Sequence, residues 1–324
     1  MSTFKEIRGT AIQSVSTDPT NPELGQIWYN NTIGVLKGYD LTLAAWAAGG
    51  NMTTAKRYPG GAGTQTAALG FGSYNPGLTS STEEYNGSTW GPGGNLTTAR
   101  GGLGGAGTQT AGLAFGGFRG APLGVSNSTE EYDGTSWGPG GNLNTSRGFL
   151  ASGGTQTAAF GAGGYIAPGN TAATEEYNGS TWSNNPTGLN TSRGDLTGCG
   201  TQTAGLAFGG SSPPPVSNLT EEYDGSTWTA GGNLNTARYA LAGFGTQTAA
   251  IACGGFTPGS SGATELYNGS SWTTSTSLGT ARYGLAGAGT SIDGLAFGGN
   301  PPPGVTITEE FTGATLAVKK ITTS

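Results

Sequence analysis

The chain has 324 residues, of which 64 are glycine and only 10% are charged, and its net charge is −6. An acidic chain with dispersed Lys and Arg lacks the basic clusters that phosphates require, so we expect no nucleic-acid partner. Histidine is absent and cysteine occurs twice; without the commonest general base and metal ligand, we expect no metal site, no cofactor and no enzymatic activity.

The first 38 residues do not fit the pattern of the rest of the chain. Residues 1–10 lack the apolar core of a signal peptide, and no later stretch approaches the about 20 apolar residues of a membrane span. Residues 26–31 and 33–39 have strand character on either side of a turn at residues 30–34, which predicts a β-hairpin. We expect residues 1–38 to form an attachment or ring-closing segment.

From residue 39 onwards, one unit recurs. Its anchor is Glu-Glu-Tyr-(Asn/Asp)-Gly-x-x-Trp, and successive tryptophans from Trp46 to Trp272 lie 44, 47, 45, 46 and 44 residues apart. A second signature, Gly-Thr-Gln-Thr-Ala, precedes an apolar run that ends in Gly-Gly. A third, Asn-Leu-x-Thr-(Ala/Ser)-Arg, stands between one anchor and the next. The last anchor is degenerate, with Phe311 in place of tyrosine and Leu316 in place of tryptophan.

Each unit contains four short segments of strand character, which we name A to D in chain order. In the second unit they are residues 102–107, 112–115, 128–132 and 136–139. Gly-Thr-Gln-Thr joins A to B, and Asn-Gly or Asp-Gly, a strong hairpin signal, joins C to D. Four strands in about 45 residues are typical of one blade of a β-propeller.

The double glycine after segment B, the tyrosine of C and the tryptophan of D, seen at Gly116-Gly117, Tyr132 and Trp137, resemble the kelch motif. The resemblance implies an all-β fold, a six-bladed kelch-like β-propeller over residues 39–324, with a short N-terminal β-hairpin extension. It also implies that one outer strand closes the ring, and residues 44–47 and 315–318 both qualify. The copper site of galactose oxidase, another kelch-type propeller, needs histidines that this chain lacks.

Two sets of charged residues occur once per unit. A ring of arginines is one reading, with an anion as its ligand, but the equal numbers of Arg and Glu favour structural ion pairs, since buried charges need partners. The arginines assigned to this set are Arg57, Arg100, Arg147, Arg193, Arg238 and Arg282. The glutamates are Glu83, Glu130, Glu175, Glu221, Glu265 and Glu309. We expect the repeated Tyr and Trp side chains to pack between blades.

The connections between segments B and C differ most among the units, in both length and sequence. In a blade of meandering strands they share one face with the D–A connections. Exposed aromatic side chains on a rigid scaffold are plausible contact residues, although they also serve simply to cover the blade ends. The candidate ligand-binding residues are Tyr74, Phe118, Arg119, Tyr165, Ile166 and Phe256.

The N-terminal string Pro22-Glu-Leu-Gly-Gln-Ile-Trp-Tyr-Asn30, followed by Gly34-Val-Leu-Lys37, resembles segments of phage tail-fibre and other virion structural proteins. The anchor and turn repeats resemble propeller proteins of marine phages, especially those of cyanobacteria. The resemblance implies a non-enzymatic tail fibre, spike or capsid fibre, made in the host cytoplasm and carried on the exterior of the particle.

Such a protein would contact other virion proteins through its N-terminal segment and a host-surface glycan or protein through its loops. A homo-oligomer, with a trimer as the expected form, fits this class, although the chain contains no trimerisation heptad. The alternative is a cellular kelch-type lectin or protein-interaction module, in which the N-terminal hairpin merely closes the ring.

Overall fold

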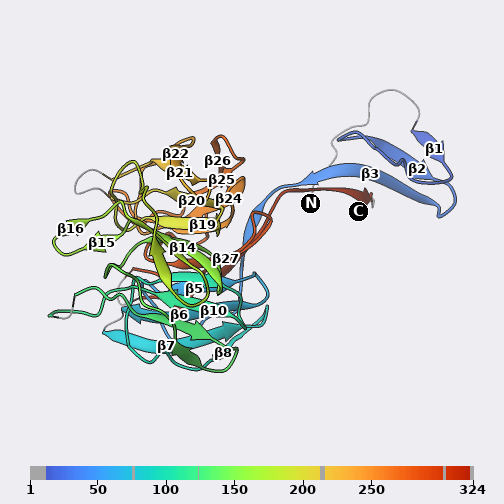
Figure 1. Cartoon of the computed structure of the whole chain (residues 1–324). Helices are drawn as coiled ribbons and strands as arrows, with labels where there is room; N and C mark the ends of the chain where they lie inside the picture. The colour runs from blue at the N-terminus through green and yellow to red at the C-terminus, as the bar shows by residue number, and fades with distance from the viewer. Residues whose placement is uncertain (1–11, 75–76, 123, 212–215, 302–303, 322–324) are drawn as a thin grey trace. The chain divides into compact units, whose positions relative to one another are not determined.

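The computed structural model describes residues 12–74, 77–122, 124–211, 216–301 and 304–321. The regular secondary structure in these ranges consists of strands (Figure 1), and no helix long and apolar enough to cross a membrane occurs in them. The chain divides into two compact units, which we describe one at a time. Unit 1 is Met1–Ala44 with Gly313–Ser324, and unit 2 is Ala45–Thr312. Residues 1–11 of the expected attachment segment lie outside the described residues.

Unit 1 is built on a single four-stranded sheet that includes the expected hairpin. Its strands, in sheet order, are β1 (Gln13–Val15), β2 (Ile27–Asn30), β3 (Val35–Thr42) and β30 (Thr315–Lys320). Strands β2 and β3 form the hairpin predicted for residues 26–39, which is thereby confirmed. The units divide the chain elsewhere than the predicted 1–38 and 39–324, because β30 pairs with β3 from Lys37 to Thr42 and so belongs to unit 1.

A single carboxylate ties the segment before β2 to this sheet. Asp18 accepts hydrogen bonds from Trp28 Nε1 at 3.0 Å and Asn30 Nδ2 at 2.8 Å, and it pairs with Lys37. These hydrogen bonds, Lys37 first, lower the pKa of Asp18 to about 2. Trp28 is fully buried, so the long segment between β1 and β2 folds back over the sheet.

Unit 2 contains six four-stranded sheets, each with strand order A-B-C-D, among the described residues. Sheets 1 to 3 are β5 (Gly60–Gly63), β6 (Ala68–Tyr74), β7 (Leu78–Tyr85), β8 (Trp90–Pro92); β9 (Gly104–Gly107), β10 (Gly112–Phe115), β11 (Thr129–Tyr132), β12 (Trp137–Pro139); and β13 (Ala151–Thr155), β14 (Ala158–Ala162), β17 (Thr174–Tyr177), β18 (Trp182–Asn184). Sheets 4 to 6 are β19 (Thr197–Thr201), β20 (Ala204–Phe208), β21 (Thr220–Tyr223), β22 (Trp228–Ala230); β23 (Ala242–Thr246), β24 (Ala249–Cys253), β25 (Thr264–Tyr267), β26 (Trp272–Ser275); and β27 (Ala286–Gly289), β28 (Asp293–Phe297), β29 (Thr308–Thr312), β4 (Ala45–Ala48). A small hairpin, β15 (Tyr165–Ile166) and β16 (Gly169–Asn170), interrupts sheet 3 between its B and C strands.

The six A strands lie next to one another around a common centre. Strand β5 contacts β9, each following A strand contacts the next, and β27 contacts β5 again. Sheets that radiate from such a centre, each made of four antiparallel strands, are the arrangement of a β-propeller. The all-β fold and the four-stranded units predicted from the repeat are therefore present.

Small residues in the A strands permit this close approach. A Cβ atom added to Gly105 in β9 would lie 2.4 Å from the carbonyl oxygen of Gly61 in β5, so the two backbones touch. Small residues such as Ala106 and Cys199 alternate with glycine and fill the space beneath the next sheet, whereas sheet 5 has Phe244 at this position. The unusual composition of the A segments thus follows from packing six strands around one narrow axis.

The closing strand is now defined. Strand β4 pairs with β29 and completes sheet 6, while β30, the other segment that qualified, belongs to unit 1. The Trp46 indole donates to Thr264 Oγ1 at 3.0 Å and packs against Phe311, with ring centroids 5.1 Å apart. The first strand of unit 2 therefore pairs with its last strand, which joins the two ends of the ring.

Repeated aromatic residues connect neighbouring sheets, as expected. Trp137 in sheet 2 donates to Thr82 Oγ1 in sheet 1 at 2.9 Å, and the Tyr132 hydroxyl bonds Glu84 there at 2.5 Å. The same pair of contacts links the equivalent residues of four further pairs of neighbouring sheets. Sheet 6 has Phe311 at the tyrosine position, and sheet 5 has Leu266 at the glutamate position. The link between sheets 5 and 6 therefore lacks the Tyr–Glu hydrogen bond, while Trp46 and Thr264 keep the Trp–Thr hydrogen bond.

The Gly-Thr-Gln-Thr turn also has a structural role that its sequence does not reveal. Gln109 Nε2 donates to the carbonyl oxygens of Ala68 and Tyr85 in the preceding sheet, at 3.0 and 2.7 Å. Four other turns repeat this bridge through Gln65, Gln156, Gln202 and Gln247. Five of the six turns thus hold adjacent sheets together through a glutamine, and the turn of sheet 6 has Ser291 at this position.

Candidate functional site

Buried ion pairs support the face of unit 2 opposite these turns, where the B–C and D–A connections lie; we call it the loop face. Arg147 and Glu175 are both fully buried, with Nη2 and Oε1 2.9 Å apart, and Arg147 Nη1 also donates to the carbonyl oxygen of Ala173. Equivalent pairs are Arg100–Glu130, Arg193–Glu221, Arg238–Glu265 and Arg282–Glu309. The predicted structural role of these arginines is confirmed.

The assignment of Arg57 to this set was wrong. Lys56 occupies the equivalent position in sheet 1: it is fully buried and lies 3.9 Å from Glu83. Arg57 is the next residue along the chain, and its guanidinium lies over the rings of Tyr58 and Tyr74, at 5.3 and 5.6 Å from their centroids. Sheet 1 therefore uses Lys56 in its buried ion pair, and Arg57 is an additional cation on the loop face.

Two residues after each buried cation, the backbone adopts a positive φ. The six residues at this position, which we call the inner ring, are Tyr58, Gly102, Phe149, Asp195, Ala240 and Gly284, with φ between 50° and 64°. Backbone amides link members from adjacent sheets: the Gly102 N–H donates to Tyr58 O, and the Phe149 N–H donates to Gly102 O, both at 2.8 Å. All six inner-ring residues line the central cavity.

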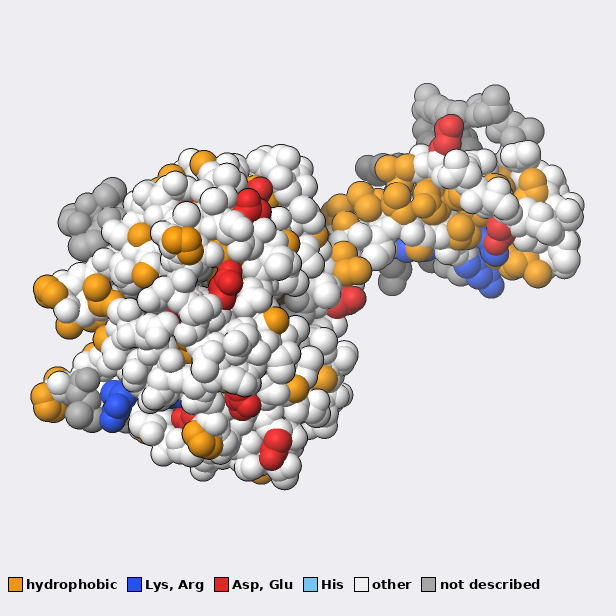
Figure 2. Space-filling view, viewed as in Figure 1, with side chains coloured by type: hydrophobic (Ala, Val, Ile, Leu, Met, Phe, Trp, Pro, Cys, Tyr) orange, Lys and Arg blue, Asp and Glu red, His pale blue; other side chains and the backbone are white. Residues whose placement is uncertain are grey.

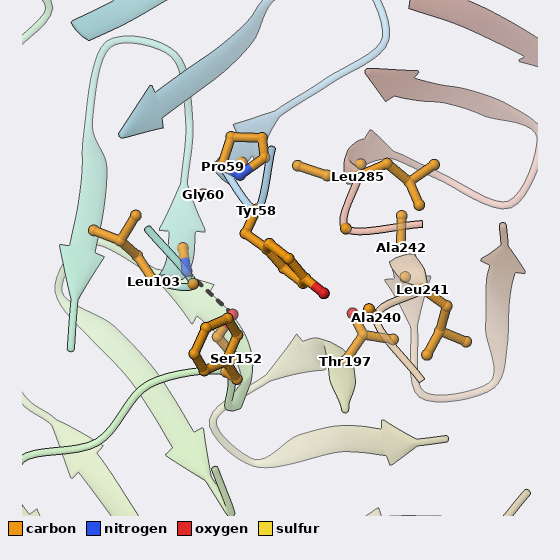
Figure 3. Close-up of a pocket in the computed structure, with 18 of the residues that line it drawn as sticks. Tyr58, Pro59, Gly60, Leu103, Ser152, Thr197, Ala240, Leu241, Ala242 and Leu285 are labelled. Carbon is orange, nitrogen blue, oxygen red and sulfur yellow. Dashed lines mark hydrogen bonds between the residues drawn. The ribbon is translucent and has the colours of Figure 1, made fainter. Parts of the chain in front are cut away.

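The central cavity itself is narrow. It has a volume of about 120 Å³ and is lined mainly by the starts of the A strands. Figure 3 shows the Tyr58 ring extending into the middle of this lining, with its hydroxyl directed toward the side formed by Thr197 and Ala240. Burial, followed by the nearby Asp195 carboxylate, raises the pKa of this hydroxyl. Tyr58 therefore remains protonated and restricts access to the cavity.

Beside the inner ring lies a wider groove of about 620 Å³, within the about 300–1,000 Å³ typical of small-ligand sites. Five aromatic rings from sheets 1 to 3 contribute to it. The residues that line it are Arg57, Tyr58, Tyr74, Gly101, Phe118, Phe149, Tyr165, Pro168, Gly169, Asn170, Asp195 and Ser211. We refer to it as the aromatic groove.

The aromatic rings contact one another in a chain. Tyr58 and Phe149 meet edge to face with centroids 5.3 Å apart, Phe149 and Phe118 are 6.4 Å apart, and Phe118 and Tyr74 are 6.1 Å apart. Such contacts hold the rings in fixed orientations. Tyr74 and Tyr165 are 39% and 37% exposed and therefore offer surface to a ligand.

Asp195 supplies the acidic group of the groove. Burial raises its pKa to about 6, because little water reaches the carboxylate to stabilise its charge. Its charge in turn contributes to the raised pKa values of Tyr58 and Tyr239. The groove thus contains one cation, Arg57, and one acid whose charge changes near neutral pH.

The raised pKa makes a testable contribution to stability. A carboxyl whose pKa is higher in the folded than in the unfolded state destabilises the fold above the folded value, and this penalty disappears as pH falls toward about 4. We expect Asp195→Asn to melt several degrees above the parent at pH 7.5, and the difference to shrink between pH 6 and pH 4. A Tm difference that is constant over this range, measured by differential scanning calorimetry, would contradict the assigned titration.

The candidate residues predicted from the sequence do not all meet in one place. Tyr74, Phe118 and Tyr165 line the aromatic groove, and Arg119 and Ile166 directly follow two of them in the chain. Phe256 instead packs between Tyr239 and Tyr283, with centroids 5.4 and 5.0 Å away. All six remain predictions as contact residues.

Sequence reasoning missed the inner-ring residues Tyr58, Phe149 and Asp195. The sequence feature that could have revealed them is a substitution at one position of the repeat: sheets 2 and 6 have glycine there, and these three residues replace it. Among the described residues, no group of three or more Cys, Asp or Glu side chains lies close enough together to hold a metal ion. The two cysteines are buried and unpaired, and burial raises both thiol pKa values to about 12.

Comparison with known proteins identifies the fold and not the family. No family model matches the chain, and no curated protein matches it. A solved structure described as "Structure of YjhT" is 13% identical and superposes with a TM-score of 0.67, over 83% of this chain and 99% of that one. At this level of identity the likeness supports a β-propeller-type fold and carries no information on activity.

Proposed function

We propose that this chain is a non-enzymatic virion structural protein, a tail fibre, spike or capsid fibre, built on a six-bladed kelch-like β-propeller. It is made in the host cytoplasm and carried on the particle exterior. The loop face of unit 2 binds a glycan or protein of the host surface. Unit 1 attaches the chain to other virion proteins and to further copies of itself, with a trimer as the expected form.

The distribution of exposed apolar side chains is the observation that carries the proposal. Among the residues that the structure describes, eight of the eleven exposed large hydrophobic side chains belong to unit 1: Ile12, Leu24, Tyr29, Ile33, Leu41, Leu43, Leu316 and Val318. Figure 2 shows orange side chains gathered over β3 and β30, the strands located in Figure 1. A sheet with an apolar face is stable when that face is buried against a second layer, and exposed patches of this kind mark interaction sites.

Leu41 and Leu316 define the centre of this apolar face. They are cross-strand partners in β3 and β30, 37% and 51% exposed, and Tyr39 pairs with Val318 two residues away on the same face. Their burial against a partner would stabilise an assembly by about 1.5–3 kcal/mol for each leucine. Unit 1 thus has the properties of an attachment unit.

Unit 2 has the opposite character. Two of the three exposed large hydrophobic residues in its described part, Tyr74 and Tyr165, lie at the aromatic groove. The rest of its surface is rich in Gly, Thr, Ser and Asn. An exposed aromatic groove held by buried ion pairs suits recognition of a ligand by a rigid surface. The alternative, a cellular kelch-type lectin or interaction module, accounts for this groove but gives the apolar face of unit 1 no partner.

The test separates the two units with the double variant Leu41→Ser, Leu316→Ser. Loss of two buried leucines is expected to weaken assembly at least about 100-fold, while each copy still binds host cells. Light scattering gives the assembly state, and retention on candidate host cells gives binding. Ile292→Ser, at an exposed turn of unit 2, is the matched control and should change neither. Unchanged assembly of the double variant would contradict the proposal.

A further inference from the structure

The inner ring carries strained residues that the fold itself does not require. Glycine occupies this position in sheets 2 and 6 and adopts φ of 64° and 62° without strain. Tyr58, Phe149 and Asp195 adopt the same conformation at φ of 51°, 56° and 50°, where a side chain costs about 1–2 kcal/mol. Strain of this kind concentrates at functional sites. Ala240, at φ of 51°, is strained as well; the other three strained side chains line the aromatic groove and Ala240 does not.

The two inner-ring glycines make room for these side chains. A Cβ atom on Gly102 would lie 2.6 Å from the Phe149 ring, and one on Gly284 would lie 3.1 Å from the Tyr58 ring. Each aromatic ring therefore rests over a neighbouring glycine. Large and small residues are therefore distributed unevenly around the inner ring, and the groove forms on the side where Tyr58, Phe149 and Asp195 lie.

The backbone around the groove has its hydrogen bonds already formed. The N–H and C=O of Phe118 bond those of Gly101, and the N–H and C=O of Tyr165 bond those of Gly148, at 2.6 to 3.1 Å. A peptide that binds by adding a strand needs free backbone groups at a sheet edge. These loops offer side chains instead, which disfavours an extended peptide as the ligand.

The side chains combine aromatic faces with both kinds of hydrogen-bonding group. Arg57 donates only, the ionised Asp195 carboxylate accepts only, and the Asn170 amide can do both. One positive and one negative group leave little net charge, and the chain carries −6, which disfavours a polyanion. Aromatic faces carry partial negative charge and attract the weakly positive C–H groups of a sugar ring. These properties together match a neutral, polyhydroxylated ring compound.

We propose that the aromatic groove binds a neutral oligosaccharide, with a pyranose ring stacked on the exposed Tyr165 or Tyr74 and its hydroxyl groups bonded to Asp195, Asn170 and Arg57. The inference rests on the proposed function, since it names the host-surface ligand of that same loop face. The strained inner-ring residues supply the carboxylate of this site, Asp195, and two of its aromatic rings, Tyr58 and Phe149.

The experiment uses the full chain on an array of immobilised neutral oligosaccharides of glucose, galactose and mannose, with uronate-bearing and sialylated glycans for comparison. The parent is expected to bind at least one neutral glycan. Asp195→Gly, which installs the residue native to this position in sheets 2 and 6, should bind at least tenfold more weakly with an unchanged or higher Tm. Tyr165→Ala should also bind at least tenfold more weakly, with its Tm unchanged. Ala240→Gly relieves the same strain at the one strained ring position that does not line the groove, so it should keep full binding with an unchanged or higher Tm.

Cell binding separates failure of this inference from failure of the proposed function. Free neutral glycan is expected to compete with host cells for the parent. If the parent binds cells and Asp195→Gly and Tyr165→Ala bind them equally well, the groove is not the site and the inference is overturned. The same holds if no neutral glycan binds, or if only charged glycans do. If the glycan binds through the groove but no host cell does, the inference stands and the host-attachment function fails.

Discussion

Replacing Arg147 with methionine is expected to reduce the free energy of unfolding by about 3–5 kcal/mol, because it leaves a buried carboxylate without its cation. Glu175 is fully buried and would retain only backbone donors, such as the Asn144 N–H at 2.6 Å. The carbonyl oxygens of Gly161, Gly163 and Ala173 would also lose their guanidinium donor. The loss should therefore affect the B–C connection of sheet 3 as well as the ion pair. Urea denaturation followed by tryptophan fluorescence measures it.

Two further variants separate the charge from the hydrogen bonds. The free energy of unfolding of Arg147→Lys should lie between the values for the parent and for Arg147→Met. Lys56 already occupies the equivalent position in sheet 1, where its ammonium donates to Ser81 O at 2.9 Å. The double variant Arg147→Met, Glu175→Leu should recover much of the loss, since it removes the unpaired charge. A loss below about 1 kcal/mol for Arg147→Met would show that the pair does not support the fold.

A fragment of residues 45–312 is expected to fold with a Tm within a few degrees of unit 2 in the full chain. It retains β4, so sheet 6 keeps its outer strand and the ring remains closed. A fragment of residues 49–312 lacks β4 and exposes the edge of β29. It also loses the contacts of the partly buried Trp46 with Thr264 and Phe311, which should cost less than the about 3–5 kcal/mol typical of a fully buried tryptophan.

Trp46→Ala in the 45–312 fragment is the matched control, since it keeps the strand but removes the indole. Its melting temperature should lie between those of the unmodified 45–312 and 49–312 fragments. Calorimetry gives the three melting temperatures. Equal stability of the 45–312 and 49–312 fragments would mean that β4 does not close the ring, and unfolding of both would mean that unit 2 depends on unit 1.

The sequence was sufficient to predict the strands of unit 2, because each turn has its own chemistry and recurs in every copy. In the second repeat the observed strands differ from the predicted segments by at most two residues at either end. The closing strand was not predictable, because residues 44–47 and 315–318 are equally apolar and short. Pairing of β30 with β3, far away in the sequence, decides between them.

The candidate site was only partly predictable for a similar reason. The aromatic residues of the B–C loops stand out because those loops vary, and three of them line the groove. Asp195 and Phe149 lie two residues after the repeated arginines, where the sequence indicates a structural role. They differ from sheets 2 and 6, which have glycine at this position, but only the structure shows that these side chains line the groove. The Lys56-Arg57 pair misled because two adjacent cations match the repeat almost equally well, and only one of them is buried beside Glu83.

Host-cell binding by the 45–312 fragment, compared with the full chain at equal protomer concentration, tests the proposed function most directly. We expect the fragment to bind cells on its own, to be monomeric, and to differ from the full chain only by the avidity that assembly through unit 1 provides. A folded 45–312 fragment that fails to bind cells to which the full chain binds would contradict it, because the binding surface would then lie outside the loop face of unit 2.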